Sequence, residues 1–158
     1  MKVCGVELTG SEAIICLLTL DSGLFGVPDC RAQKFVLAGQ TQEDTKAFQF
    51  AFQKLMQDYK VEHVVIKERA TRGKFSGSAA GFKMEAAIQL IEGLTVHLQN
   101  NATEKACIKR NPMPVEFADT GLKMFQQNAF NSAYVYLTNE HFGVVSDDDT
   151  EINPIYKL

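Results

Sequence analysis

The sequence is poor in the residues that build disulfide scaffolds and clustered metal sites. Its 158 residues include four cysteines and three histidines. The cysteines lack CxxC spacing, and the histidines stand singly without the spacing of metal ligands, so we expect each histidine to be a packed or surface residue. An excess of basic charge is also absent, since the formal net charge is −3. Any nucleic-acid binding must therefore come from a local basic patch.

Long hydrophobic runs are missing too. The longest apolar stretch, from Ala13 to Leu18, is far too short to span a bilayer. The first residues do not show the basic region, apolar core and cleavage site of a secretion signal. We therefore expect no membrane segment and a reducing, cytoplasmic location.

What is present fits one ordinary globular domain. Hydrophobic residues make up 46% of the chain and charged residues 22%. A domain of this size buries roughly 70% of the surface that its unfolded chain exposes. We expect the domain to span residues 1–141. Residues 142–158, with three consecutive aspartates and a proline, are expected to form an irregular C-terminal extension.

The first forty residues show the period of two that is typical of strands. Cys4, Val6 and Leu8 fall on one face of a first strand. A Thr-Gly-Ser turn leads into a second run that is apolar on both faces, as a central strand would be. The pattern predicts an antiparallel meander with strands over residues 2–8, 12–20 and 32–37 and a loop over 21–29.

Helical spacing begins at Thr41, which forms a near capping box with Asp44. The order β-β-β-α-β-α-β-α is predicted, which indicates an α/β fold with a mixed five-stranded sheet and helices on both faces. The later elements are a helix from Thr41 through Met56, a strand over 61–68, a basic loop over 69–81, a helix containing Ala86 to Ile91, a strand over 95–98 and a long helix from Pro112 to about Asn139.

Short motifs within this order resemble the RNase H-like superfamily, and its Holliday-junction resolvase branch in particular. That branch begins with a strand of the type GxD and a Gly/Ser turn, which here match residues 5–7 (GVE) and 9–11 (TGS). Its fourth strand ends in a glutamate, here Glu68, before a loop and a helix rich in small residues, here 78–81 (SAAG). The chain is also similar to small uncharacterised bacterial families of this superfamily, for which the resemblance implies no activity.

The resemblance implies a metal-dependent site. Nucleases of this superfamily bind two divalent ions about 4 Å apart, which activate water and stabilise the leaving oxygen. Such oxygen-rich sites suit Mg²⁺ or Mn²⁺. Glu7 and Glu68, at the carboxyl ends of neighbouring strands, are the implied metal ligands. The alternative is that Glu7 only hydrogen-bonds its turn, while Glu68 pairs with Arg69 or Arg72.

The last helix matches the branch less well. The branch presents two aspartates three residues apart, and the corresponding positions here carry amides. Asp119 lies nine residues earlier, about 13 Å away along a continuous helix. Asp147 to Asp149 belong to an acidic run, which is usually solvated. An incomplete, degenerate catalytic site is therefore predicted, made of Glu7, Glu68, Asn128 and Asn131.

A basic segment over residues 69–78 is the strongest positive feature. It places two arginines, a lysine and Phe75 before a helix N-terminus, where exposed N–H groups favour an anion such as phosphate. Arginine grips phosphate, and an aromatic ring stacks on bases. The alternative is a solvated surface loop without a ligand. The predicted phosphate-binding residues are Arg69, Arg72, Lys74, Ser76 and Ser78.

The sequence leaves functions of different classes open. The first is a nucleic-acid-binding protein or a weak metal-dependent nuclease that uses Mg²⁺ or Mn²⁺. The second is a non-catalytic interaction or scaffold module that keeps only the fold, and its apolar helix faces leave room for a homodimer interface. A nucleotide-handling enzyme is a third, less favoured hypothesis, because actin-like kinases share the core but need a second domain.

Overall fold

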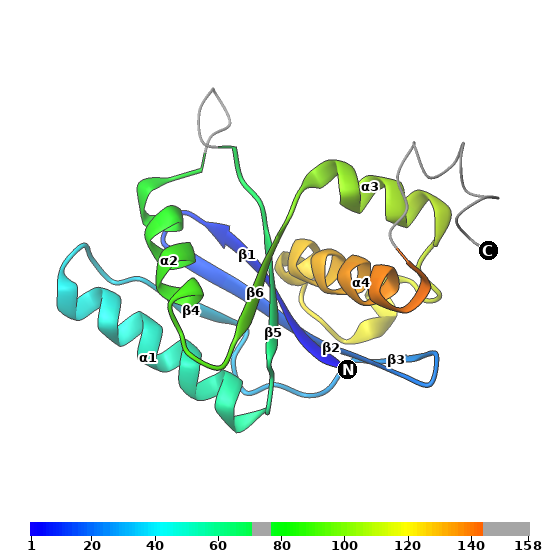
Figure 1. Cartoon of the computed structure of the whole chain (residues 1–158), viewed down its shortest axis with the longest axis horizontal. Coiled ribbons are helices and arrows are strands. Elements are labelled where there is room, and N and C mark those ends of the chain that lie inside the picture. Colours follow the sequence, from blue (N-terminus) through cyan, green and yellow to red (C-terminus); the bar gives the residue numbers. More distant parts are fainter. Residues whose placement is uncertain (71–76, 144–158) are drawn as a thin grey trace.

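The period-two pattern of the N-terminal third builds most of a mixed sheet. The computed structural model describes residues 1–70 and 77–143, and six strands of this part form one sheet (Figure 1). They are β1 (Lys2–Thr9), β2 (Glu12–Asp21), β3 (Leu24–Gly26), β4 (Lys34–Val36), β5 (His63–Lys67) and β6 (Thr95–Gln99). β2 pairs antiparallel with β1, β3 and β4. β5 lies between β1 and β6 and runs parallel to both.

Side-chain caps mark where most helices begin. Thr41 accepts a hydrogen bond from the Asp44 N–H and Asp44 accepts one from the Thr41 N–H, so the predicted capping box is confirmed. Ser78 and Asn100 cap the next two helices in the same way, each accepting from the N–H three residues on. The helices are α1 (Gln42–Asp58), α2 (Ala79–Gln89), α3 (Asn101–Arg110) and α4 (Gln127–Phe142), with the 3-10 turns η1 (Phe117–Thr120) and η2 (Met124–Gln126) before α4.

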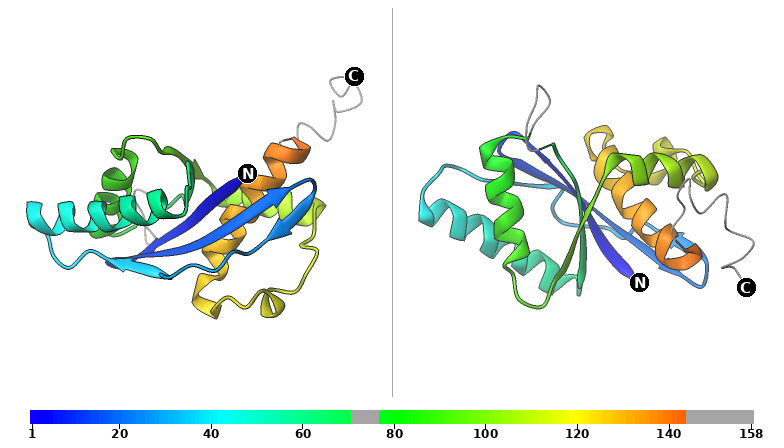
Figure 2. Two further views of the ribbon diagram at one scale, coloured as in Figure 1. Left: turned by 90° about the horizontal axis from the view of Figure 1, so that it is seen from below. Right: turned by 45° about the horizontal axis from the view of Figure 1, so that its top comes forward.

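Alternation along the strands divides the core into two layers, one on each face of the sheet. Cys4 and Val6 of β1 pack on the side of α1 and α2, together with Phe52 of α1. Val3 of β1 packs on the other side, against α4 residues such as Tyr134. Figures 1 and 2 show the two helix pairs on opposite sides of the sheet.

β1 and α4 touch at a glycine. A Cβ atom on Gly5 would overlap the carbonyl oxygen of Ala129, and it would also press on the Cβ of Ala133. Glycine is thus required here by close approach of a helix to the strand. This contact fixes the first turn of α4 over the carboxyl half of β1, where Glu7 lies.

The predicted α/β class, with a mixed sheet and helices on both faces, is confirmed, but three details of the prediction were wrong. A short strand, β3, forms inside the predicted loop. α3 was not predicted. The long helix from Pro112 is instead two 3-10 turns and then α4, because Gly121 adopts a left-handed φ of 80° and ends η1.

No helix in residues 1–70 and 77–143 has the length and hydropathy needed to cross a membrane. The cytoplasmic location stays a prediction. The division into a domain over residues 1–141 and an extension over 142–158 also stays a prediction, and residues 144–158 lie outside the described part of the chain.

Candidate functional site

Two of the predicted site residues meet at the carboxyl end of β1. The Nδ2 of Asn128, in the first turn of α4, donates a hydrogen bond to Oε2 of Glu7 over 2.7 Å. Glu7 is half-buried and Asn128 is exposed, so the pair lies at the surface. Because the amide presents its N–H to the carboxylate, it supports the charge of Glu7 as a neutral donor.

A lysine lies beside this pair. The parallel register matches Val6 of β1 with Ile66 of β5, so Lys67 follows on β5 where Glu7 follows on β1. Alternation places both side chains on the α4 side of the sheet. Lys67 turns toward α3, where its Nζ lies 2.7 Å from Oε1 of Glu104.

Glu104 is the centre of a buried polar network. Its side chain is 3% exposed, and it accepts hydrogen bonds from Gln99 Nε2 and from the Ser132 hydroxyl as well as from Lys67. Gln99 also donates to the Ser132 carbonyl oxygen, 3.0 Å away. These bonds join β5, β6, α3 and α4 next to Glu7. Sequence reasoning missed the network, because α3 was not predicted and the network joins residues from four separate elements.

Glu68 and Asn131 are not drawn into the Glu7 contact. Glu68 is exposed just past the end of β5, and its backbone N–H donates to the Gln99 carbonyl oxygen. Asn131 is half-buried on α4. Within the described part of the chain neither side chain makes a hydrogen bond, so their place in a site with Glu7 stays a prediction.

The basic segment is described only at its two ends. Arg69 forms an ion pair with Glu85 of α2 at 2.8 Å and lies over the ring of Phe82, so its charged partner among the described residues is Glu85 and not Glu68. Ser78 caps α2 and donates to the Gly10 carbonyl oxygen, 3.0 Å away. The other predicted phosphate-binding residues, Arg72, Lys74 and Ser76, lie outside the described residues.

The donor set around Glu7 does not fit two divalent cations. Its neighbours are an amide that presents N–H and a lysine that brings positive charge, whereas Mg²⁺ and Mn²⁺ need several converging oxygens. In the described ranges no three His, Cys, Asp or Glu side chains cluster as metal ligands do. Asp119 is exposed in η1. Binding of Mg²⁺ or Mn²⁺ stays a prediction.

A second polar cluster lies farther along the same face. Nδ1 of His63 and Nε2 of His97 are 3.3 Å apart, and the His97 ring centre lies 4.5 Å from that of Tyr136 on α4. Burial and the neighbouring His63 lower the pKa of His97, although Glu140 acts in the opposite direction. Burial raises the pKa of Tyr136. No sequence pattern indicated this pair, because the two histidines are 34 residues apart.

The fold matches solved resolvases across most of the chain. Thermus thermophilus RuvC has a TM-score of 0.70 at 12% identity, with 91% of this chain and 98% of that one covered. The same protein in complex with a Holliday-junction substrate gives 0.67 at 11% identity, covering 90% and 96%. A Fowlpox virus resolvase in complex with Holliday-junction DNA gives 0.55 at 13% identity, covering 90% and 99%. At these identities the likeness shows a shared RNase H-like, resolvase-like fold, as predicted.

Comparison of sequences adds one family. The family model described as "Protein of unknown function (DUF3010)" matches residues 1–136. No curated protein matches the sequence significantly.

Proposed function

The chain belongs to the DUF3010 family, and we propose that it binds branched nucleic acid and does not cleave it in a two-metal reaction. The fold is the first support, because it spans nearly the whole of two resolvases described in complex with Holliday-junction DNA. Fold alone does not determine function, so the site decides between binding and cleavage.

The observation that carries the proposal is the hydrogen bond from Asn128 to Glu7. Two-metal hydrolysis needs carboxylates whose negative charge offsets the cations. Here Glu7 receives a neutral N–H donor, and Lys67 on the neighbouring strand is paired with Glu104. The described residues at the end of β1 therefore present a single hydrogen-bonded carboxylate.

Binding would use the basic segment that ends at the α2 N-terminus. Arg72 and Lys74 are the proposed phosphate contacts there, while Ser78 ties the helix start to the β1–β2 turn through the Gly10 carbonyl oxygen. The turn follows β1, so Ser78, at the described end of this segment, adjoins the strand that carries Glu7. A phosphate backbone bound at this edge would pass close to Glu7.

The test measures binding and cleavage on the same DNA. A fluorescent synthetic four-way junction and a linear duplex of the same composition are titrated with the full chain in EDTA, followed by anisotropy. We expect tighter binding of the junction. In Mg²⁺ or Mn²⁺ we expect the junction strands to stay intact. Absence of any preference for the junction would overturn the binding part. Metal-dependent cleavage that Glu7→Gln abolishes would overturn the non-cleaving part.

A matched pair of double variants locates the binding surface. Arg72→Ala with Lys74→Ala should weaken binding and lower the slope of log K against log salt by about 2, because each phosphate contact contributes about 1. Lys46→Ala with Lys54→Ala removes the same charge from exposed positions of α1. If the α1 variant loses as much affinity as the loop variant, the contact is a general charge effect.

A second candidate is a protein-interaction module, and one surface favours it. Leu24 is 76% exposed and Val115 is 53% exposed, and both border a hollow of about 250 Å³ whose other walls include Phe130 and Tyr134. The occupant that fits the sequence-based prediction is a second copy of the chain. A concentration-dependent dimer in sedimentation velocity that Leu24→Glu abolishes would favour this candidate. A monomer at all concentrations would remove it.

A further inference from the structure

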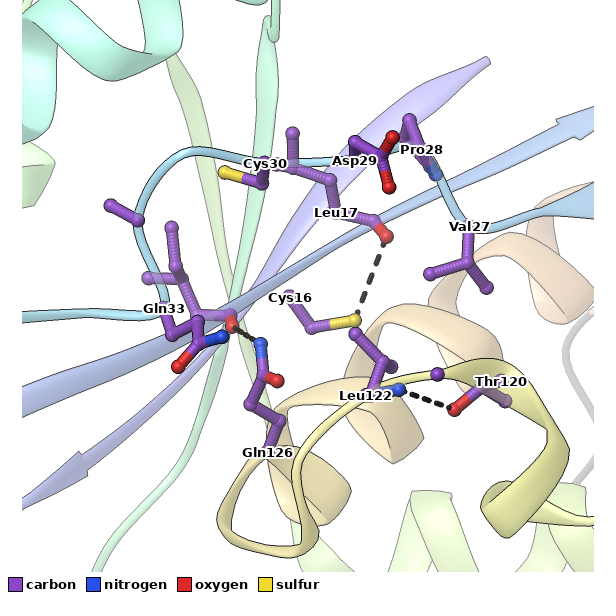
Figure 3. Close-up of a pocket in the computed structure, with 13 residues that line it drawn as sticks. Cys16, Leu17, Val27, Pro28, Asp29, Cys30, Gln33, Thr120, Leu122 and Gln126 are labelled. Atoms are coloured by element: carbon purple, nitrogen blue, oxygen red, sulfur yellow. Dashed lines mark hydrogen bonds between the residues drawn. The ribbon is translucent and has the colours of Figure 1, made fainter.

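The outer edge of β2 is interrupted by a small polar pocket (Figure 3). β3 covers this edge from Thr19 onward and β4 covers it up to Ile14. Between them the chain over residues 27–33 leaves the strand and encloses a cavity of about 180 Å³. That volume is slightly larger than a cavity of about 150 Å³ known to hold benzene, so it accommodates one six-membered ring.

The pocket is bordered by a backbone donor and acceptor that the sheet does not use, those of Leu17, a residue that is 2% exposed. The backbone N–H and C=O of Ile15 point away from β1. The N–H donates to the Gln33 carbonyl oxygen, and the carbonyl oxygen accepts from Gln126 Nε2. Alternation turns the Leu17 N–H and C=O to the same side. Within residues 1–70 and 77–143 the Leu17 N–H has no acceptor, and its carbonyl oxygen receives only the weak S–H of Cys16, at 3.6 Å.

The walls of the pocket are already fixed by their own bonds. Gln126 donates to Ile15 and accepts from the Lys123 N–H, so its amide is held at both ends. The Thr120 hydroxyl donates to the Phe117 carbonyl oxygen and accepts from the Leu122 N–H. Val27, Pro28 and Leu122 supply apolar surface. The polar groups left for a ligand therefore include the N–H and C=O of Leu17 and the side chains of Gln33 and Asp29.

The N–H and C=O of one extended residue point in the same direction and lie close together. A planar ring with an acceptor next to a donor complements them, as in the N–H and C=O of a cyclic imide or the pairing edge of a nucleobase. We propose that this pocket binds a pyrimidine base by its Watson–Crick edge. The choice of a nucleobase among cyclic imides rests on the proposed function, and the size of the cavity favours one ring over two.

Cys30 provides a native reporter of occupancy. It lines the pocket and is half-buried, whereas Cys4, Cys16 and Cys107 are buried. Burial raises the pKa of Cys16 to about 12, so that thiol stays protonated and unreactive. Alkylation by iodoacetamide should therefore occur first at Cys30, as identified by mass spectrometry of the peptide, and Cys30→Ser should remove the signal.

The test compares uridine with 3-methyluridine, in which a methyl group replaces the edge donor. With uridine at about ten times its Kd, alkylation of Cys30 should slow about tenfold, because only free protein reacts. 3-Methyluridine should give no protection. The amide resonance of Leu17 should shift with uridine alone. Equal protection by both nucleosides, or by neither, overturns the proposal.

Two further probes separate the sources of the base. A short oligouridylate is compared with free uridine on the basis of total uridine concentration. If the oligonucleotide protects Cys30 from alkylation at a far lower concentration, the pocket takes a base presented by a strand. Equal potency indicates a free nucleoside. Protection by uridine in a chain that shows no junction binding supports the pocket and removes the proposed function, whereas junction binding without protection does the reverse.

Discussion

At the scale of single residues, Gly5 leaves the least room for a larger side chain. Gly5→Ala should lower the free energy of unfolding by about 1–3 kcal/mol, because the added methyl group meets the Ala129 carbonyl oxygen, which cannot move without shifting α4. Urea unfolding measures the loss. Gly26→Ala is the matched control, since its methyl group would meet only the Thr19 hydroxyl. If the two variants lose equal stability, close approach of α4 is not the cause.

The pair of Lys67 and Glu104 should show the asymmetry of a buried charge pair. Glu104→Leu leaves the Lys67 ammonium, which is 24% exposed, without its partner, and should cost about 3 kcal/mol of unfolding free energy. Adding Lys67→Met should restore only the part of the loss that comes from the unpaired ammonium, because Gln99 and the Ser132 hydroxyl still lack their acceptor. Glu116→Ala, at an exposed position, should change little. A double variant as unstable as Glu104→Leu would show that packing, and not charge, sets the cost.

At the scale of elements, two helix caps can be compared directly. Thr41→Ala and Ser78→Ala should each lower the unfolding free energy by about 1 kcal/mol, because each removes the acceptor for an N–H in the first turn. Thr41→Asn and Ser78→Asp keep an acceptor and should retain most of the stability. Asp or Asn variants as unstable as the alanine variants would show that the caps do not hold these helices.

The elements that the sequence predicted are those with a strong apolar period. α1 shows a regular row of Phe48, Phe52 and Leu55, and the alternation of β1 was equally clear. α3 was missed because its burial is slight: only Glu104 and Cys107 are buried, so no apolar stripe appears, and the cap at Asn100 was the available signal. β3 was missed because three residues are too few for a period.

The candidate site was predictable as far as local motifs reach. The GVE motif and the comparison of the last helix with the two aspartates of the resolvase branch singled out Glu7 and Asn128, and the structure joins them. The roles of Lys67, Glu104 and Leu17 come from register, burial and the edge of a sheet. Those properties depend on which strands are neighbours, which no short stretch of sequence contains.

At the scale of the whole molecule, stability should fall on mild acidification. The folded protein holds the pKa of His97 below its ordinary value near 6.5. Below pH 6.5 the unfolded chain therefore binds a proton more readily than the folded protein does. The free energy of unfolding consequently decreases as the pH falls. Groups that face His97 are His63, Tyr136 and Glu140. The thermal midpoint should decrease from pH 7 to pH 5.

The variant that checks this dependence is His97→Gln, which cannot take up the proton. It should flatten the pH dependence of the thermal midpoint, while His141→Gln, at an exposed position, should leave the slope unchanged. An unchanged slope in His97→Gln would assign the acid sensitivity to carboxylates elsewhere.

The division of the β2 edge also bears on how the protein behaves in concentrated solution. Free strand edges invite other chains to add strands, and this is a common route to cross-β aggregates. One side of this sheet is covered by two strands of three residues each, β3 and β4, and the other side ends in the five residues of β6. Among the described residues the sheet thus presents no long free edge to another chain, and we expect aggregation to require unfolding first.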